Sequence, residues 1–247
     1  MPDVPTYLAM LVVVATAYTI FGLTGFGSAM VAVPILVQFV PLGFAVPLVL
    51  LLDLTSTLAL GVRNWKLAAG GEMLRLMPFM ALGIAIGVGV LAGVNSRWLL
   101  FFLGAFVLAN VAWNLFAGPA RLPLLDRRWA VPAGVVGGIF SALFGTGGPV
   151  YTIYLLRRVE NPSAFRATIA SVILVSALLR VGAFGMSGLL HQQHLLTDWM
   201  ALLPACAFGL FAGNRLHGIL SPRHARQAML GVLALGGLGV LAKALSV

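Results

Sequence analysis

Long apolar runs with few charges fill most of this 247-residue chain, as in 99–116 and 229–241. Charged residues make up only 9% of the sequence, whereas a soluble domain carries about 25%. Such a chain cannot cover its own surface in water. A spanning helix needs roughly 20 mainly apolar residues, whereas a membrane barrel shows short alternating segments. The sequence therefore predicts an all-α integral membrane protein in a lipid bilayer.

The formal net charge of +9 does not indicate a nucleic-acid partner. The basic residues stand in short groups between apolar runs, which is the pattern of topology signals and not of a phosphate-binding face. Cys206 is the single cysteine, so the chain has no internal disulfide or cysteine-rich metal site. No His, Asp or Glu cluster has metal-ligand spacing, and no metal or cofactor is expected. The N-terminus has no Lys or Arg before its apolar run, so we expect the first helix to be retained.

Two of the apolar regions are interrupted by small residues. Residues 22–28 read GLTGFGS and residues 145–149 read GTGGP. A shift of 120 positions places Gly25 on Gly145 and Gly27 on Gly147. After an insertion around 191–196 the shift becomes 126, which places Gly83 on Gly209 and Gly87 on Gly213. We therefore predict a duplication within one membrane domain, with a first repeat over 1–119 and a second over 129–247. Each repeat is a glycine-broken hairpin (5–41; 129–156) followed by three spans (44–62, 72–93, 98–117; 163–190, 198–217, 225–245).

The Lys and Arg positions favour hairpins that return to the side they entered from. If all eight apolar regions crossed once, the basic residues would divide evenly between the two sides, against the positive-inside rule. With two re-entrant hairpins, only Arg97 and Lys243 lie opposite the rest, and Arg180 falls inside a span. The crowded side is then cytoplasmic, both termini are exoplasmic, and the second repeat is inverted, as in many secondary transporters. In the alternative interpretation, the glycines merely let helices pack closely.

Both breaks precede a predicted helix start, at Ser28 or Ala29 and at Pro149. A helix N-terminus presents N–H groups and a partial positive charge, and glycines let an anion approach the backbone. Inverted repeats would direct two such termini at one small, compact anion. The predicted substrate-binding residues are Gly25, Gly27, Ser28, Gly145, Thr146, Gly147, Gly148, Pro149 and Arg180.

Arg180 and Asp53 are the charged residues deepest in predicted spans. A buried arginine is costly in a membrane, so it is by default a functional hypothesis. In one interpretation the two residues form a structural ion pair. In another, Arg180 is an anion ligand and Asp53 carries a coupling proton or cation. Arg180 could also extend its charged end to the interface.

The segments GLTGFGSAMVAVPIL and FGTGGPVYTIYLL resemble the paired glycine-rich motifs of the TauE/SafE family, the sulfite exporters of the anion permease class. The resemblance covers nearly the whole chain. It implies a multi-pass protein of the bacterial inner membrane that exports small sulfur-containing anions such as sulfite or organosulfonates. Ser28 and Ala29 stand where glycine is common in the first motif. The roles of Arg180 and Asp53 come from the residues alone.

Three classes of function follow from these patterns. The first is a secondary transporter of a small anion, coupled to protons or sodium, with a homodimer as one expected assembly. The second is a passive anion channel or a membrane subunit of a larger transport complex. The third, an intramembrane enzyme, is disfavoured because the nucleophilic Gly-x-Ser-Gly setting and a histidine within the spans are missing. The chain is therefore predicted not to be an enzyme.

Overall fold

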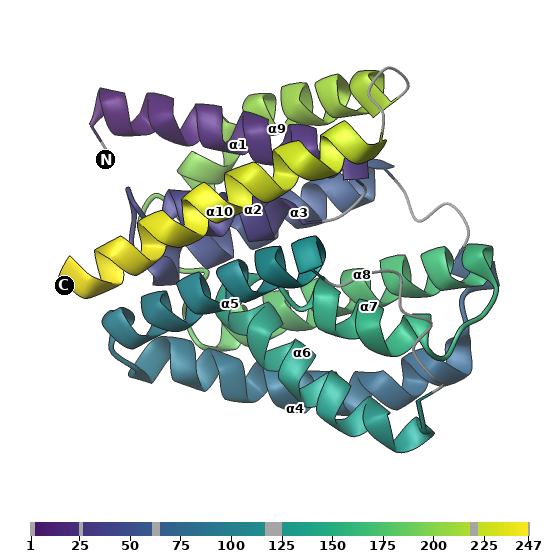
Figure 1. Cartoon of the computed structure of the whole chain (residues 1–247). Coiled ribbons are helices and arrows are strands. Elements are labelled where there is room, and N and C mark those ends of the chain that lie inside the picture. The colour runs from purple at the N-terminus through teal and green to yellow at the C-terminus, as the bar shows by residue number, and fades with distance from the viewer. Residues whose placement is uncertain (1–2, 25–26, 61–64, 117–124, 218–221, 247) are drawn as a thin grey trace. The chain divides into compact units, whose positions relative to one another are not determined.

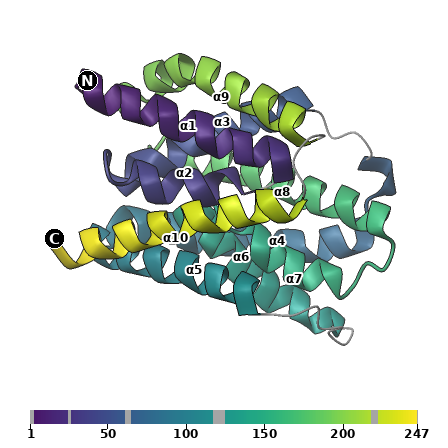
Figure 2. The same ribbon diagram turned by 45° about the horizontal axis from the view of Figure 1, so that its top comes forward.

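The computed structural model of the chain (Figures 1 and 2) describes residues 3–24, 27–60, 65–116, 125–217 and 222–246. These residues form α-helices joined by short connections, with no strand among them. The helices are α1 (Val4–Thr24), α2 (Ser28–Leu36), α3 (Leu42–Leu60), α4 (Gly70–Gly93), α5 (Ser96–Phe116), α6 (Ala130–Phe144), α7 (Gly148–Leu156), α8 (Pro162–Met186), α9 (Leu195–His217) and α10 (Pro222–Ser246), with 3-10 turns at Trp65–Leu67 and Arg127–Trp129.

Within the described ranges, seven helices are long and apolar enough to span a bilayer: α1, α3, α4, α5, α8, α9 and α10. The prediction of an all-α membrane protein is confirmed. By contrast, α2 and α7 have nine residues each. At a rise of 1.5 Å per residue each is about 13 Å long, less than half of the roughly 30 Å of hydrocarbon. These short helices follow the two predicted breaks.

The helices form two compact units that each combine segments from both predicted repeats. Unit 1 consists of residues 1–52, 94–119 and 191–247, and unit 2 of residues 53–93 and 120–190. In unit 1, α1 packs along α9, and α10 packs against α5 and α2. In unit 2, α4 packs along α6 and also contacts α8. Sequence repeat and packing unit are therefore different divisions of the chain.

Glycines let the helix backbones approach closely in both units. In unit 1, a Cβ on Gly209 would meet the Ala15 carbonyl oxygen, and one on Gly213 would meet the Thr19 carbonyl oxygen. In unit 2, a Cβ on Gly83 would meet the carbonyl oxygen of Val135. A Cβ on Gly87 would lie 2.9 Å from the Ile139 carbonyl oxygen. The two crossings thus have the same construction, and small residues at such contacts are typical of packing between membrane helices.

These contacts repeat at the offsets found in the sequence. Gly83 and Gly209 are 126 positions apart, and the residues they touch, Val135 and Ala15, are 120 positions apart. The same offsets relate Gly87 with Ile139 to Gly213 with Thr19. These matched contacts in the structure support the predicted duplication more strongly than matching residue types in the sequence do. The inverted orientation of the copies stays a prediction.

In unit 1, the broken helix begins and ends at the same end of the unit. Gly209 and Gly213 meet Ala15 and Thr19 in ascending order, so α1 and α9 run parallel and begin together. Just before α9, Gln192 Nε2 donates to the Gly43 carbonyl at 2.8 Å, shortly after α2 ends. The return of the chain supports the predicted re-entrant hairpin.

The same end of unit 1 carries both basic residues predicted to lie on the sparsely charged side. Lys243 Nζ donates to the Val37 carbonyl at 2.6 Å and the Gln38 carbonyl at 3.1 Å, just after α2. Arg97 Nε donates to the Ala244 carbonyl at 3.2 Å. Arg97 and Lys243 therefore lie close together, as the charge pattern predicts.

The glycine crossing gives a first test. In a Gly83→Ala variant the new methyl group would overlap the Val135 backbone, and overpacking of this kind costs about 1–3 kcal/mol. We expect the melting temperature in detergent to fall by several degrees, because a large domain shifts by about 2–4 °C per kcal/mol. The buried Cys206 thiol allows unfolding to be followed with a thiol-reactive dye. Gly89→Ala on the same helix is the control, since nothing lies within 4 Å of its Cβ position. Equal melting temperatures for the two variants would contradict the packing described.

Candidate functional site

The second helix break lies between α6 and α7, in unit 2. Gly145 ends α6 in a left-handed conformation, with φ of 72°, which glycine adopts without strain. Its N–H still donates to the Ser141 carbonyl at 2.9 Å. Gly147 caps α7, which begins at Gly148 with Pro149 in its first turn. Proline is well placed there, because the missing N–H would have no partner within the helix.

A buried arginine lies against this break. Arg180, on α8, is buried, and its Nη1 donates to the Ser141 carbonyl at 3.1 Å. That carbonyl belongs to the last turn of α6, where a positive charge is stabilised by the helix dipole. A guanidinium has five N–H donors and a permanent positive charge, so Arg180 can contact the break and still attract an anion. The prediction that Arg180 belongs to the second break is consistent with this geometry.

Three hydroxyl groups connect the helices around Arg180. Ser176, one turn before Arg180 on α8, donates from its Oγ to Ser141 Oγ at 3.2 Å. The Tyr151 hydroxyl, from the first turn of α7, lies 3.5 Å from Ser141 Oγ. Ser141 therefore links α6 to both α7 and α8. Residue 147, next to this group, must be glycine, because a Cβ there would collide with Ser141 Oγ and the Gly137 carbonyl oxygen.

Thr146 is the residue at the break that most needs a ligand. It is 2% exposed, and its Oγ1 has no hydrogen-bond partner among the described residues. A buried hydroxyl without a partner costs about 1–3 kcal/mol. An anion oxygen at the break would accept a hydrogen bond from Thr146. The predicted residues Gly145, Thr146, Gly147, Gly148 and Pro149 thus lie together with Arg180.

The first break lies in unit 1 and is described only in part. Gly27 is left-handed, with φ of 91°, and α2 begins at the buried Ser28, as predicted. Gly25 lies outside the described residues. A Cβ on Gly27 would meet nothing within 4 Å, whereas Gly147 is closely surrounded. The two breaks therefore differ in their surroundings, and their predicted meeting at one anion stays a prediction.

Asp53 lies in the middle of α3 and is half-buried. Its predicted roles, as a partner of Arg180 or as a carrier of the coupling ion, stay predictions. Within the described ranges, no group of three or more His, Cys, Asp or Glu residues could hold a metal ion.

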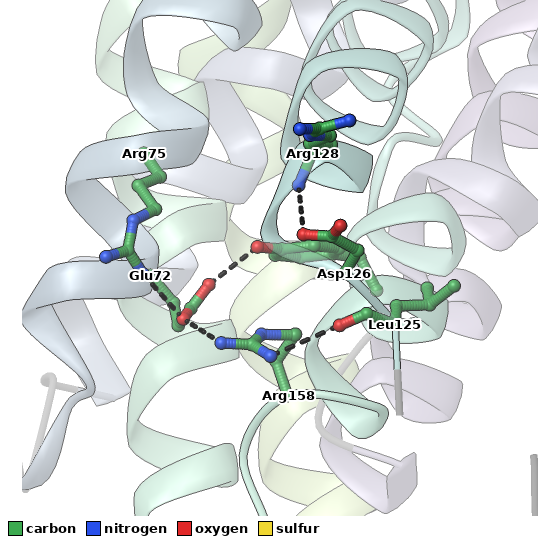
Figure 3. Close-up of polar contacts among 7 residues, drawn as sticks. Glu72, Arg75, Leu125, Asp126, Arg128 and Arg158 are labelled. Atoms are coloured by element: carbon green, nitrogen blue, oxygen red, sulfur yellow. Dashed lines mark hydrogen bonds and ion pairs between the residues drawn. The ribbon is translucent and has the colours of Figure 1, made fainter. Parts of the chain in front are cut away.

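A second polar cluster, the Glu72 cluster (Glu72, Arg75, Tyr154 and Arg158), joins the start of α4 to the end of α7 (Figure 3). Glu72 Oε1 lies 2.9 Å from both Arg75 Nη1 and Arg158 Nη2. The Tyr154 hydroxyl donates to Glu72 Oε2 at 2.6 Å. The hydrogen bond to Glu72 raises the pKa of the Arg158 guanidinium and so stabilises its charged form.

Arg158 also shows where the second hairpin returns. Its Nη1 donates to the Leu125 carbonyl at 3.2 Å. Leu125 precedes α6 and Arg158 follows α7, so the chain enters and leaves the broken helix at one end of unit 2. This matches the first hairpin and supports the predicted re-entrant form.

Sequence reasoning missed several of these residues. Tyr151 and Glu72 were not selected, because each obtains its role from a partner on another helix. Ser141 and Ser176 are also absent from the predicted binding residues. Their spacing of 35 positions across two helices carries no signal in one sequence.

Apolar helices long enough to span, two broken helices and a buried cationic site together define a multi-pass helical membrane protein. The chain belongs to the sulfite exporter TauE/SafE family, whose model matches residues 9–240. The family resemblance of the glycine motifs is confirmed.

Two curated relatives carry transporter names, which points away from an enzyme. One is the probable inner membrane transporter protein TsaS of Comamonas testosteroni, 28% identical over 194 residues, covering 78% of this chain and 81% of the relative. The other is the probable sulfite/organosulfonate exporter TauE of Cupriavidus necator, 24% identical over 186 residues, covering 74% and 70%. No solved structure gives a significant match.

A double-mutant cycle tests the Glu72 cluster. The Arg158 and Arg75 side chains contact the same carboxylate but are 18% and 40% exposed. Buried charges are screened less, so we expect a coupling energy of roughly 1–3 kcal/mol between Glu72→Gln and Arg158→Gln. For Glu72→Gln with Arg75→Gln we expect about 0–1 kcal/mol. Unfolding of the single and double variants in mixed detergent micelles would measure both coupling energies. A stronger coupling of Glu72 to Arg75 than to Arg158 would contradict this assignment.

Proposed function

We propose that this protein is a secondary transporter that exports small sulfur-containing anions, sulfite or organosulfonates, across the bacterial inner membrane. Membership of the family and the name of the Cupriavidus necator relative support this substrate class. The name of the Comamonas testosteroni relative supports a transporter of the inner membrane. The single observation that carries the proposed site is that the Thr146 hydroxyl of the break is buried without a hydrogen-bond partner among the described residues, while the buried Arg180 guanidinium binds the end of α6 just before it.

The chemistry of the second break suits a compact oxyanion. Arg180 supplies a permanent positive charge, and an arginine fork matches the spacing of oxyanion oxygens. Thr146 supplies a hydroxyl donor, and the start of α7 supplies backbone N–H groups with a partial positive charge. In hydrocarbon these donors act at low dielectric constant, where their attraction for an anion is strong.

An anion that bound too tightly could not be released, so its attraction to Arg180 must be balanced by an interaction that the empty protein already makes. The Ser141 carbonyl already accepts a hydrogen bond from Arg180. In the proposal, Arg180 keeps this bond while the site is empty and shares its charge with the anion when the site is filled. The break then remains closed in both states, and binding stays weak enough for transport.

Transport by purified protein in proteoliposomes tests the site. We expect Arg180→Gln to lower the initial rate of radiolabelled sulfite transport at least tenfold, the factor that corresponds to about 1.4 kcal/mol. Arg180→Lys should keep part of the rate, because it retains the charge without the fork. Arg166→Gln is the control, since it removes an exposed charge near the start of the same helix.

Two glycines give a matched pair in the same assay. Gly147→Ala should abolish transport, because its methyl group would displace Ser141 Oγ, whereas Gly182→Ala, on α8, should retain it, since nothing lies within 4 Å of its Cβ position. Wild-type rates in both Arg180→Gln and Gly147→Ala would contradict the proposed site.

The proposed coupling role of Asp53 has a separate readout. If Asp53 carries the coupling proton, Asp53→Asn should transport sulfite down its own gradient but no longer respond to an imposed pH step. Transport by the unchanged protein should saturate with sulfite, as a carrier does and an open channel does not. A full response to the pH step in Asp53→Asn would exclude this role.

A further inference from the structure

A groove with apolar walls lies next to the Glu72 cluster. It has a volume of ≈ 230 Å³ and is formed by α6, α7 and the residues just before α6. Trp129, Val136 and Ile153 line it and are exposed at its rim. Tyr154 also lines it, while its hydroxyl donates to Glu72. The groove therefore offers an incoming molecule apolar surface.

Two exposed arginines directly precede Trp129, which lines this groove. Arg127 and Arg128 are the first two residues of the 3-10 turn that ends in Trp129. Asp126 uses its carboxylate to accept the backbone N–H of Arg128 at 3.3 Å. In Figure 3 the Arg128 side chain lies apart from the cluster in which Arg158 binds Glu72. The Arg128 side chain is therefore placed outside that cluster.

The order of these residues matches the depth profile of a phospholipid. Tryptophan favours the membrane–water interface, and Trp129 separates the two arginines from the apolar wall at Pro132, Ala133 and Val136. Basic residues at this level attract anionic headgroups, and arginine forks bind phosphate. A free anion would gain nothing from the apolar wall, and an uncharged alkyl chain would gain nothing from the arginines.

We propose that this groove is a binding site for an anionic phospholipid, with one acyl chain along α6 and α7 and the phosphate against Arg127 and Arg128. The site is separate from the proposed anion site, and its test does not depend on transport. A lipid here would pack against the ring of Tyr154, whose hydroxyl holds Glu72.

Photolabelling in vesicles tests the site directly. The intact protein is reconstituted with a trace of phosphatidylglycerol or phosphatidylcholine that carries a photoreactive group in one acyl chain, and labelled peptides are identified by mass spectrometry. We expect the phosphatidylglycerol label to concentrate in residues 125–136 and 150–154. The phosphatidylcholine label should be at least fivefold weaker there, since about 1 kcal/mol per basic residue corresponds to roughly fivefold.

Two sets of variants separate headgroup from acyl chain. R127Q/R128Q should lower the phosphatidylglycerol label at least fivefold, whereas R166Q/R215Q removes the same charge at exposed positions elsewhere and should not. Val136→Trp should block the groove, whereas Val12→Trp, at an exposed position on α1, should not.

Cys206 labelling first verifies that each variant is folded. Three outcomes would overturn the proposal: a label spread evenly over exposed helix faces, equal labelling by both lipids, or equal labelling of R127Q/R128Q and R166Q/R215Q. The arginine pair lies on the surface, so this last comparison holds even if Val136→Trp fails to fold.

Discussion

A helix that breaks within hydrocarbon leaves peptide groups that need new partners, because no water is available to them. At the second break the Ser141 carbonyl receives both the Gly145 N–H and the Arg180 guanidinium. These two hydrogen bonds to one carbonyl close the end of α6 and hold a positive charge near the break. The position of Ser176, one turn from Arg180, and the need for glycine at 147 both follow from this arrangement.

The close helix crossings keep this arrangement in place. Gly83 and Gly87 let α4 approach α6 at backbone distance, and the Glu72 cluster joins the start of α4 to the end of α7. The two segments of the broken helix, α6 and α7, are therefore held at their outer end. Within the break, Thr146 Oγ1 has no hydrogen-bond partner among the described residues. A rigid frame around an incomplete polar site is what binding of a small anion requires.

Much of this could be predicted from one sequence, and the rest could not. Apolar length gives the spans, and the small residues around 145–149 give the break, because both signals are local. The offset of 126 between Gly83 and Gly209 predicts a duplication, but the matched pair of contacts that these glycines make is seen only in the structure. The sequence could not predict the roles of Tyr151 and Glu72 or the bond from Arg180 to Ser141. Each depends on which residues of different helices lie at the same depth.

Hydrogen–deuterium exchange of the purified protein, with and without sulfite, tests the central claim most directly. If the anion binds at the second break, saturating sulfite should slow exchange in peptides that cover residues 145–151, because the N–H groups of Gly147 and Gly148 at the start of α7 would then donate to the anion. Chloride at equal ionic strength should have a much smaller effect. Unchanged exchange over 145–151, under conditions in which sulfite transport is saturated, would contradict the assignment of the anion site to this break.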